Sequence, residues 1–157
     1  MKKDPRFVKA HTKQRAFGYV CDITQQSDVP QPCIDSANVT TLLFCLSAID
    51  PDKMPAAVTN VASILKSGGT LLFRDYGRYD EAQMKLGTSR NKCLKENFYQ
   101  KYDGTKCYYF TLEDLEKLFT SVGLKVLELE YLQRLYDNLK SGEKRRRVWV
   151  HGRFLKP

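Results

Sequence analysis

The pattern that most constrains this fold is one helix between two apolar runs of strand length. Val39–Leu46 has the sequence VTTLLFCL and Thr70–Phe73 has TLLF, so neither run alternates as a strand with one wet face does. Between them, Asp50 is suited to cap a helix and Gly68-Gly69 to end it. A buried strand, a helix and a second buried strand predict a βαβ unit, and hence a parallel sheet with a right-handed crossover.

Sequence patterns on either side of this unit extend the predicted sheet. The sequence FGYVC at Phe17–Cys21 is a short strand candidate, and Asp4–Thr12 could be the end of a short helix. Apolar residues alternate in 127–131 and again in 148–152, so we expect a closing antiparallel pair on an otherwise parallel sheet. The fold class that follows is α/β, and 157 residues suffice for one domain.

Residues 77–111 form a distinct middle segment, which is rich in Tyr, Lys and Arg and has no sustained period. Within it, Asp103-Gly104 lies between aromatic flanks, which predicts a β-hairpin. Thr111 and Asp114 then resemble a capping box that opens a helix. The rings of the hairpin either face RNA or form a small satellite core, and we expect at least half of them to be buried: Phe98, Tyr99, Tyr102, Tyr108, Tyr109 and Phe110.

The net charge, the cysteines and the hydropathy restrict the partners, the metal sites and the location that we expect. The net charge is +8, from 26 Lys and Arg against 18 Asp and Glu. This balance favours RNA or DNA as a partner, although a merely soluble basic chain is equally consistent with it. The five cysteines are odd in number and form no C-x-x-C pair, which argues against a disulfide framework and a zinc ribbon, and there are only two histidines. We therefore expect no metal site and a reducing, cytoplasmic location. No apolar stretch reaches 18 residues, so we expect no membrane span.

Acidic residues follow the ends of two predicted strands, which is where open α/β sheets bind ligands. Asp22 follows Phe17–Cys21, and Asp75 follows Arg74 at the end of the second apolar run. A carboxylate at such a position can accept hydrogen bonds from an amine or a ribose. The alternatives are a helix cap or a turn for Asp22, and a local ion pair with a turn for Arg74-Asp75.

Four stretches in this order resemble one enzyme family, the methyltransferase-like tRNA 3-methylcytidine methyltransferases. They are LLFCLSAIDPDKM at 42–54, LKSGGTLLFRDYGRYDEAQMK at 65–85, NFYQKYDGTKCYYFT at 97–111 and RVWVHGRFLKP at 147–157. The resemblance runs from about Gly18 to the last residue. It implies a Rossmann-like class I fold, S-adenosyl-L-methionine as methyl donor, and N3 of a cytidine in the tRNA anticodon loop as acceptor. Whether an aminoacyl-tRNA synthetase or another protein assists is left open.

The resemblance assigns three cofactor-binding residues. The carboxylate of Asp22 would accept from the adenine amine, the backbone of Ile23 would lie alongside, and Leu43 takes the place of an apolar residue near the cofactor. For the side chains of Ile23 and Leu43, core packing is the better explanation. No catalytic residue is assigned, because N3 of neutral cytosine carries a lone pair and needs alignment and a flipped-out base more than a strong general base.

The segment 77–111 is expected to be an insertion that faces RNA. The candidate RNA-binding residues are basic or aromatic, and for 145–147 a solvated charge run is an equal alternative: Arg74, Tyr99, Lys101, Lys106, Arg145, Arg146 and Arg147.

One element of the family pattern is missing, since none of the nine glycines stands in a G-x-G-x-G turn. By the resemblance, the chain begins just before the third strand and lacks the first two strands and their glycine loop. We therefore expect 1–157 to be a single, partial methyltransferase domain, with a nuclear or mitochondrial location open for a longer parent. Three functions are considered: a tRNA cytidine N3-methyltransferase of which this chain is the carboxyl-terminal part, a non-catalytic remnant that binds RNA or protein, and a methyltransferase for a small molecule or protein.

Overall fold

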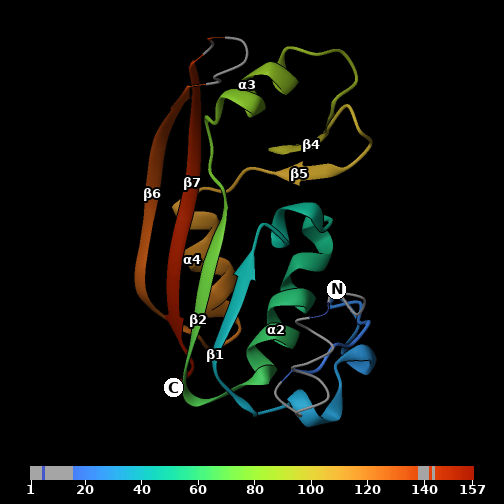
Figure 1. Cartoon of the computed structure of the whole chain (residues 1–157), viewed down its shortest axis with the longest axis vertical. Coiled ribbons are helices and arrows are strands. Elements are labelled where there is room, and N and C mark those ends of the chain that lie inside the picture. Colours follow the sequence, from blue (N-terminus) through green and yellow to red (C-terminus); the bar gives the residue numbers. More distant parts are fainter. Residues whose placement is uncertain (1–4, 6–15, 138–141, 143) are drawn as a thin grey trace.

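Four strands form the main sheet of the computed structural model, which describes residues 5, 16–137, 142 and 144–157. Their order is β1 (Ala37–Leu43), β2 (Leu65–Tyr76), β7 (Lys144–Leu155) and β6 (Lys125–Asp137). Strands β1 and β2 are parallel, whereas β7 is antiparallel to both of its neighbours (Figure 1). The predicted parallel unit and the predicted antiparallel closing pair are both confirmed.

The helix between β1 and β2 is α2 (Met54–Ile64), and its ends differ slightly from the prediction. Asp50 caps a short 3-10 turn, Pro51–Lys53, that leads into α2, because its side chain accepts a hydrogen bond from the Asp52 N–H. The helix ends at Ile64 rather than at the glycine pair. Leu65 is fully buried and already extended, and it pairs with Ala37 of β1, so the chain leaves the helix before it reaches the glycines.

The hydrophobic core lies on one face of the main sheet, beneath α2 and α4 (Leu112–Ser121). The capping box predicted for α4 is present, with Thr111 and Asp114 bonded reciprocally. Buried side chains from both helices and from three strands form one cluster, which includes Val58, Val61, Leu115, Phe119, Leu42, Phe73, Val150 and Phe154. Among the described residues, no helix covers the opposite face of the sheet, which we call the open face.

A second, smaller sheet forms in the middle segment, after α3 (Glu81–Gly87). Its strands are β3 (Cys93–Lys95), β4 (Phe98–Gln100) and β5 (Lys106–Tyr108), and all neighbours are antiparallel. The hairpin predicted at Asp103-Gly104 is confirmed, since β4 and β5 flank it and Gly104 has the positive φ of +82° that a tight turn requires. Three of the six rings are buried, as expected: Phe98, Tyr109 and Phe110.

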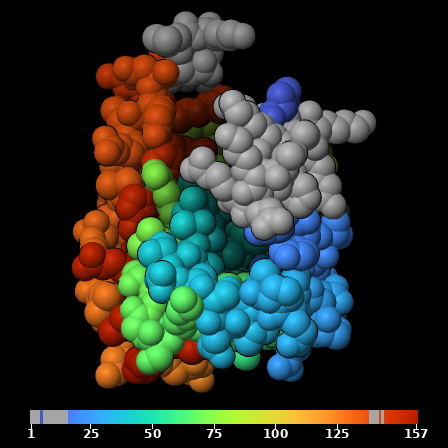
Figure 2. All heavy atoms as spheres, turned by 60° about the horizontal axis from the view of Figure 1, so that its bottom comes forward, coloured from blue at the N-terminus to red at the C-terminus, as the bar shows by residue number. Residues whose placement is uncertain are grey.

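The strand predicted at Phe17–Cys21 is wrong. The segment is irregular, and Val20 is almost fully exposed. The cause lies a few residues on, where the Ile23 carbonyl accepts a hydrogen bond from the Asn60 side chain of α2. This contact holds the chain beside α2, away from the sheet; Figure 2 shows the blue residues of this region against the helix layer. Apart from residue 5, the helix predicted at Asp4–Thr12 lies outside the described residues.

Two kinds of feature are absent from the described residues. None of the helices found there has the length and apolar content that a membrane crossing requires. Within the same residues, no group of three or more His, Cys, Asp or Glu side chains could hold a metal ion.

Candidate functional site

Strand β1 ends in a strained turn at the edge where ligands are expected. Phe44 has a positive φ of +49°, which is rare for a bulky residue and is typically kept only where the surroundings enforce it. Its N–H donates to the Arg74 carbonyl of β2 over 2.8 Å, which is one such constraint. Such strain concentrates at binding sites, so the turn after β1 marks a candidate site.

Asp75 ties this turn to the end of β2. Its side chain is fully buried, and its two oxygens accept from the N–H groups of Ser47 at 3.0 Å and Tyr76 at 2.9 Å. Burial raises the pKa of the Asp75 carboxyl, although these hydrogen bonds and nearby Lys101 act in the opposite direction. The predicted alternative of a local ion pair with Arg74 is wrong, because successive side chains of a strand point to opposite faces and Arg74 lies on the open face.

Aromatic and cationic side chains gather around Tyr76, next to Asp75. The Phe44 ring lies 5.2 Å from the Tyr76 ring, measured between centroids. Lys101 Nζ lies 5.2 Å from the Tyr76 ring centroid, and the Arg147 guanidinium carbon lies 5.4 Å from it. Cations over aromatic faces are attracted by the ring quadrupole, so these contacts hold two positive charges at the strand ends.

Arg74 and Trp149 extend this group across the open face. The Arg74 guanidinium carbon lies 4.2 Å from the Trp149 ring and 5.8 Å from the Phe44 ring. We call Phe44, Arg74, Tyr76, Lys101, Arg147 and Trp149 the Tyr76 cluster. It offers aromatic faces for stacking and three cations for phosphate contact, which are the two ingredients of single-stranded nucleic-acid binding.

A buried ion pair fixes one cation of the cluster. Asp80 is fully buried at the start of α3, where one oxygen caps the helix through the Ala82 N–H. The other oxygen accepts from Arg147 Nε at 2.8 Å and from the Val148 N–H at 2.9 Å. Asp80 therefore anchors α3 to β7 and holds the Arg147 side chain against Tyr76.

The structure brings together three of the seven residues predicted to bind RNA, namely Arg74, Lys101 and Arg147. The other four lie elsewhere. Tyr99 packs on the buried Tyr109 ring with 5.8 Å between centroids, and Lys106 lies over Phe98. On β7, the Arg146 guanidinium donates to Gln133 and Arg145 stands opposite Tyr136, so the basic run divides between the two faces of the sheet.

The three residues predicted to bind the cofactor are not assembled into one site. Asp22 is a turn residue, as the alternative held, because its carboxylate accepts from both the N–H and the hydroxyl of Thr24 at 2.9 Å, which lowers the pKa of Asp22. Ile23 packs partly against the core beside α2, as expected. Leu43 is 52% exposed on the open face, so core packing is wrong for it; the strand alternation gives the inward position to Leu42.

Sequence reasoning missed Phe44, Tyr76, Trp149 and Asp80. Trp149 is the only tryptophan in the chain. It lies between the buried Val148 and Val150 on β7, so the alternation of side chains along the strand places it on the open face. The same alternation puts Tyr76 on the face opposite to Asp75. These two signals could have identified the cluster face, whereas the contact of Asp80 with Arg147 joins distant segments and has no local signal.

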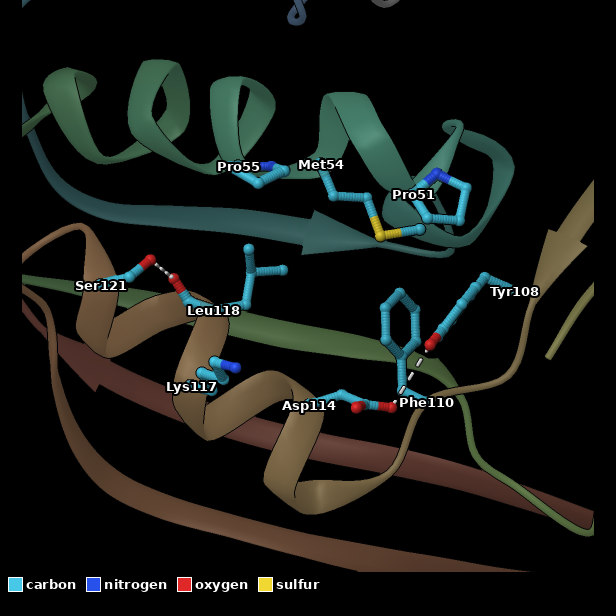
Figure 3. Close-up of a pocket in the computed structure, with 9 residues that line it drawn as sticks. All are labelled: Pro51, Met54, Pro55, Tyr108, Phe110, Asp114, Lys117, Leu118 and Ser121. Carbon is cyan, nitrogen blue, oxygen red and sulfur yellow. Dashed lines mark hydrogen bonds between the residues drawn. The ribbon is translucent and has the colours of Figure 1, made fainter. Parts of the chain in front are cut away.

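Three cavities lie in the described part of the chain, and one of about 360 Å³ is lined by Lys101 and Tyr109 beside α3. A second, of about 290 Å³, lies between the start of α2 and α4, where Met54, Pro55 and Leu118 line it and the Tyr108 hydroxyl donates to Asp114 (Figure 3). It contains none of the predicted site residues. The third, of about 270 Å³, lies on the open face and is lined by Leu43 and Arg74 among others, so it joins one predicted cofactor residue to one predicted RNA residue.

Comparisons with known proteins agree on the class of domain. A family profile described as a methyltransferase domain matches residues 5–129. The tRNA N(3)-cytidine methyltransferase METTL2 of Xenopus tropicalis is 41% identical over 148 residues, which cover 94% of this chain and 43% of that protein. METTL2B of Homo sapiens is 40% identical, with 91% of this chain and 37% of that protein covered. O-methyltransferase 3 of Dictyostelium discoideum is 39% identical, with 94% and 34% covered.

Solved structures support the fold alone. A SAM-dependent methyltransferase of Methanosarcina mazei superposes with a TM-score of 0.62 at 16% identity, covering 98% of this chain and 78% of that one. One of Anabaena variabilis gives a TM-score of 0.62 at 16% identity, covering 96% and 64%. The expected Rossmann-like class is thus confirmed, and the chain spans less than half the length of the curated relatives it matches.

Proposed function

The chain belongs to the methyltransferase-domain family, and on that premise we propose that it contributes the RNA-handling part of an enzyme that transfers a methyl group from S-adenosyl-L-methionine to N3 of a cytidine in tRNA. The observation that carries the proposal is 41% identity with a tRNA N(3)-cytidine methyltransferase across 94% of this chain. tRNA is then the partner, and we infer a cytoplasmic location because all five cysteines are free thiols, as is usual in a reducing compartment. The proposed reaction is compatible with a helper protein such as an aminoacyl-tRNA synthetase.

The part of the reaction that these residues support is the handling of RNA. The Tyr76 cluster combines rings that can stack on a base with cations that can contact phosphate, at the edge where the strands end. Asp75 is too deeply buried to contact a base, so its role is to hold the Ser47 turn against Tyr76. N3 of cytosine supplies its own lone pair, so aligning a flipped-out base is the main task of such a site.

The residues predicted to bind the methyl donor do not come together as a donor site. Asp22 and Ile23 lie beside α2 while Leu43 lies on the open face, and no G-x-G-x-G turn occurs in the sequence. We therefore expect no measurable S-adenosyl-L-methionine binding to this chain alone in titration calorimetry. Tight binding would show that a donor site forms by some other arrangement of these residues.

Binding of tRNA at increasing salt tests the acceptor half of the proposal. We expect affinity to fall steeply with salt, because cations on the protein displace condensed counterions from the phosphates. Arg74→Gln and Lys101→Gln should each weaken binding and flatten the salt dependence. Lys125→Gln is the matched control, because it removes one positive charge at the start of β6, near the other end of the sheet, and should leave tRNA affinity unchanged within twofold.

A second function is methyl transfer to an acceptor other than tRNA, such as a small molecule, and one relative favours it, because O-methyltransferase 3 of Dictyostelium discoideum is named for transfer to oxygen. It predicts weak tRNA binding that responds to salt only slightly and equally in all three variants. That result would contradict the tRNA proposal and support the small-molecule reaction.

A further inference from the structure

The largest of the three cavities lies within the middle segment, between α3 and the β4–β5 hairpin. Its volume of about 360 Å³ is that of a small-ligand site, and every residue that lines it falls between 82 and 109. The site is therefore built by one segment of the chain. Two of the lining residues, Leu86 and Tyr109, are buried and give the cavity an apolar base.

Tyr102 lines the same cavity and is an exposed ring that is held in place. It is 77% exposed, the most of any aromatic side chain among the described residues. Its hydroxyl is nevertheless hydrogen bonded to the Ser89 hydroxyl at 2.9 Å. The hairpin turn fixes its backbone, because the Lys101 N–H donates to the Thr105 carbonyl over 2.7 Å. A ring held in this way loses little conformational freedom when a ligand stacks on it.

The surroundings of the Tyr102 ring connect the cavity to the Tyr76 cluster. Lys92 Nζ lies 4.8 Å from the Tyr102 ring centroid, and Lys92 does not line the cavity, so the ring can take a second partner from the cavity side. Lys101 lines the cavity and also lies over the Tyr76 ring. One cation therefore adjoins both places.

The charged residues of the lining leave Lys101 as the one best placed to contact a phosphate. The other lysine, Lys85, is paired with Glu81 across one helical turn at 2.6 Å. The acidic residue, Asp103, is engaged within the turn, where its carboxylate accepts from the Thr105 hydroxyl at 2.6 Å and the Thr105 N–H at 3.0 Å. An exposed ring beside a lysine has the composition of a single-stranded nucleic-acid site.

We propose that this cavity binds a nucleotide of the tRNA next to the target cytidine, with its base stacked on Tyr102 and its phosphate at Lys101. The site rests on the proposed function, in which the target base is handled at the Tyr76 cluster. Because Lys101 adjoins both sites, the two nucleotides are neighbours in a single-stranded stretch of the RNA. Every base has a π face, so this contact positions the RNA without reading its sequence.

Fluorescence anisotropy with a labelled RNA stem-loop of a tRNA anticodon arm tests the site. Tyr102→Leu should weaken binding about fivefold or more, because one base stack is lost. It should leave the slope of affinity against salt unchanged, because no charge is removed. Tyr102→Phe keeps the ring and should bind within about twofold of the parent. Tyr19→Leu is the matched control, because Tyr19 is also exposed, at 53%, but lies in the irregular segment before Asp22.

Stem-loops with a single abasic position identify the stacked base. At one position next to the target cytidine, removal of the base should weaken binding to the parent but not to Tyr102→Leu, because that variant has already lost the same contact.

Four outcomes would overturn the inference: a Tyr102→Leu variant that binds as tightly as the parent, a Tyr102→Leu variant with a flattened salt dependence, a Tyr19→Leu variant that is weakened equally, or the lack of any abasic position coupled to Tyr102. None of them touches the dependence of tRNA binding on Arg74 and Lys101, so the proposed function would stand. A parent chain that binds no RNA would contradict both. Circular dichroism shows whether each variant is folded, as we expect for a substitution at the exposed Tyr102.

Discussion

The two edge strands of the main sheet differ in how they meet solvent. Strand β6 is antiparallel to its neighbour, and on the open face its Glu128 forms an ion pair with Arg153 of β7 at 3.6 Å. Strand β1 is parallel to its neighbour and presents Val39 and Leu43 on that face. Antiparallel strands commonly have one solvated face, whereas parallel strands are built for burial on both. The sheet thus has one edge strand, β6, whose charged side chains suit contact with water, and one edge strand, β1, whose apolar side chains suit burial.

The largest effect we expect separates the two faces of β1. Leu42 is 5% exposed within the core, so Leu42→Ala should lower the free energy of unfolding by about 2–5 kcal/mol. Leu43→Ala, one residue along on the open face, should cost within about 0.5 kcal/mol if that face is uncovered. Urea unfolding of both variants measures the difference. Equal losses would mean that the open face is covered, and the contrast between the edges would fail.

We expect a smaller effect on the pH dependence of stability from Asp75, on the core face of β2. Burial raises the pKa of Asp75 in the folded state, so the folded chain binds this proton more tightly than the unfolded chain does. Its contribution to stability is present below the usual aspartate pKa of about 3.9 and is lost as pH rises through the higher folded value. Asp22, Asp50 and Glu81 have lowered pKa values and act in the opposite sense, losing stability as pH falls.

The variant Asp75→Asn isolates this contribution. Relative to the parent, it should gain stability as pH rises through the acid range, because it has no proton to lose. Urea unfolding at a series of pH values for both proteins gives the difference directly. If the difference is independent of pH, or has the opposite sign, Asp75 is not buried as a carboxyl between Ser47 and Tyr76.

Local signals explain what the sequence could predict. The βαβ unit, the Asp103-Gly104 hairpin and the Thr111 capping box depend on residues close together in the chain, and all three were confirmed. The strand at Phe17–Cys21 failed because a contact with α2 outweighed its apolar pattern. The Tyr76 cluster was found only in part, since its rings and cations come from four segments, the end of β1, β2, the β4–β5 turn and β7, which are distant in the sequence.

The smallest effect we expect comes from the Glu128–Arg153 ion pair, and it tests whether the β6 edge of the sheet is exposed to solvent. Glu128 and Arg153 are each about half exposed and 3.6 Å apart, so Glu128→Gln should lower the free energy of unfolding by at most about 1 kcal/mol. Salt should reduce that loss further, because it screens exposed pairs. Denaturant unfolding at low and high salt provides the measurement. A loss well above 1 kcal/mol that salt did not change would place this pair away from solvent, and β6 would then need a neighbour as much as β1 does.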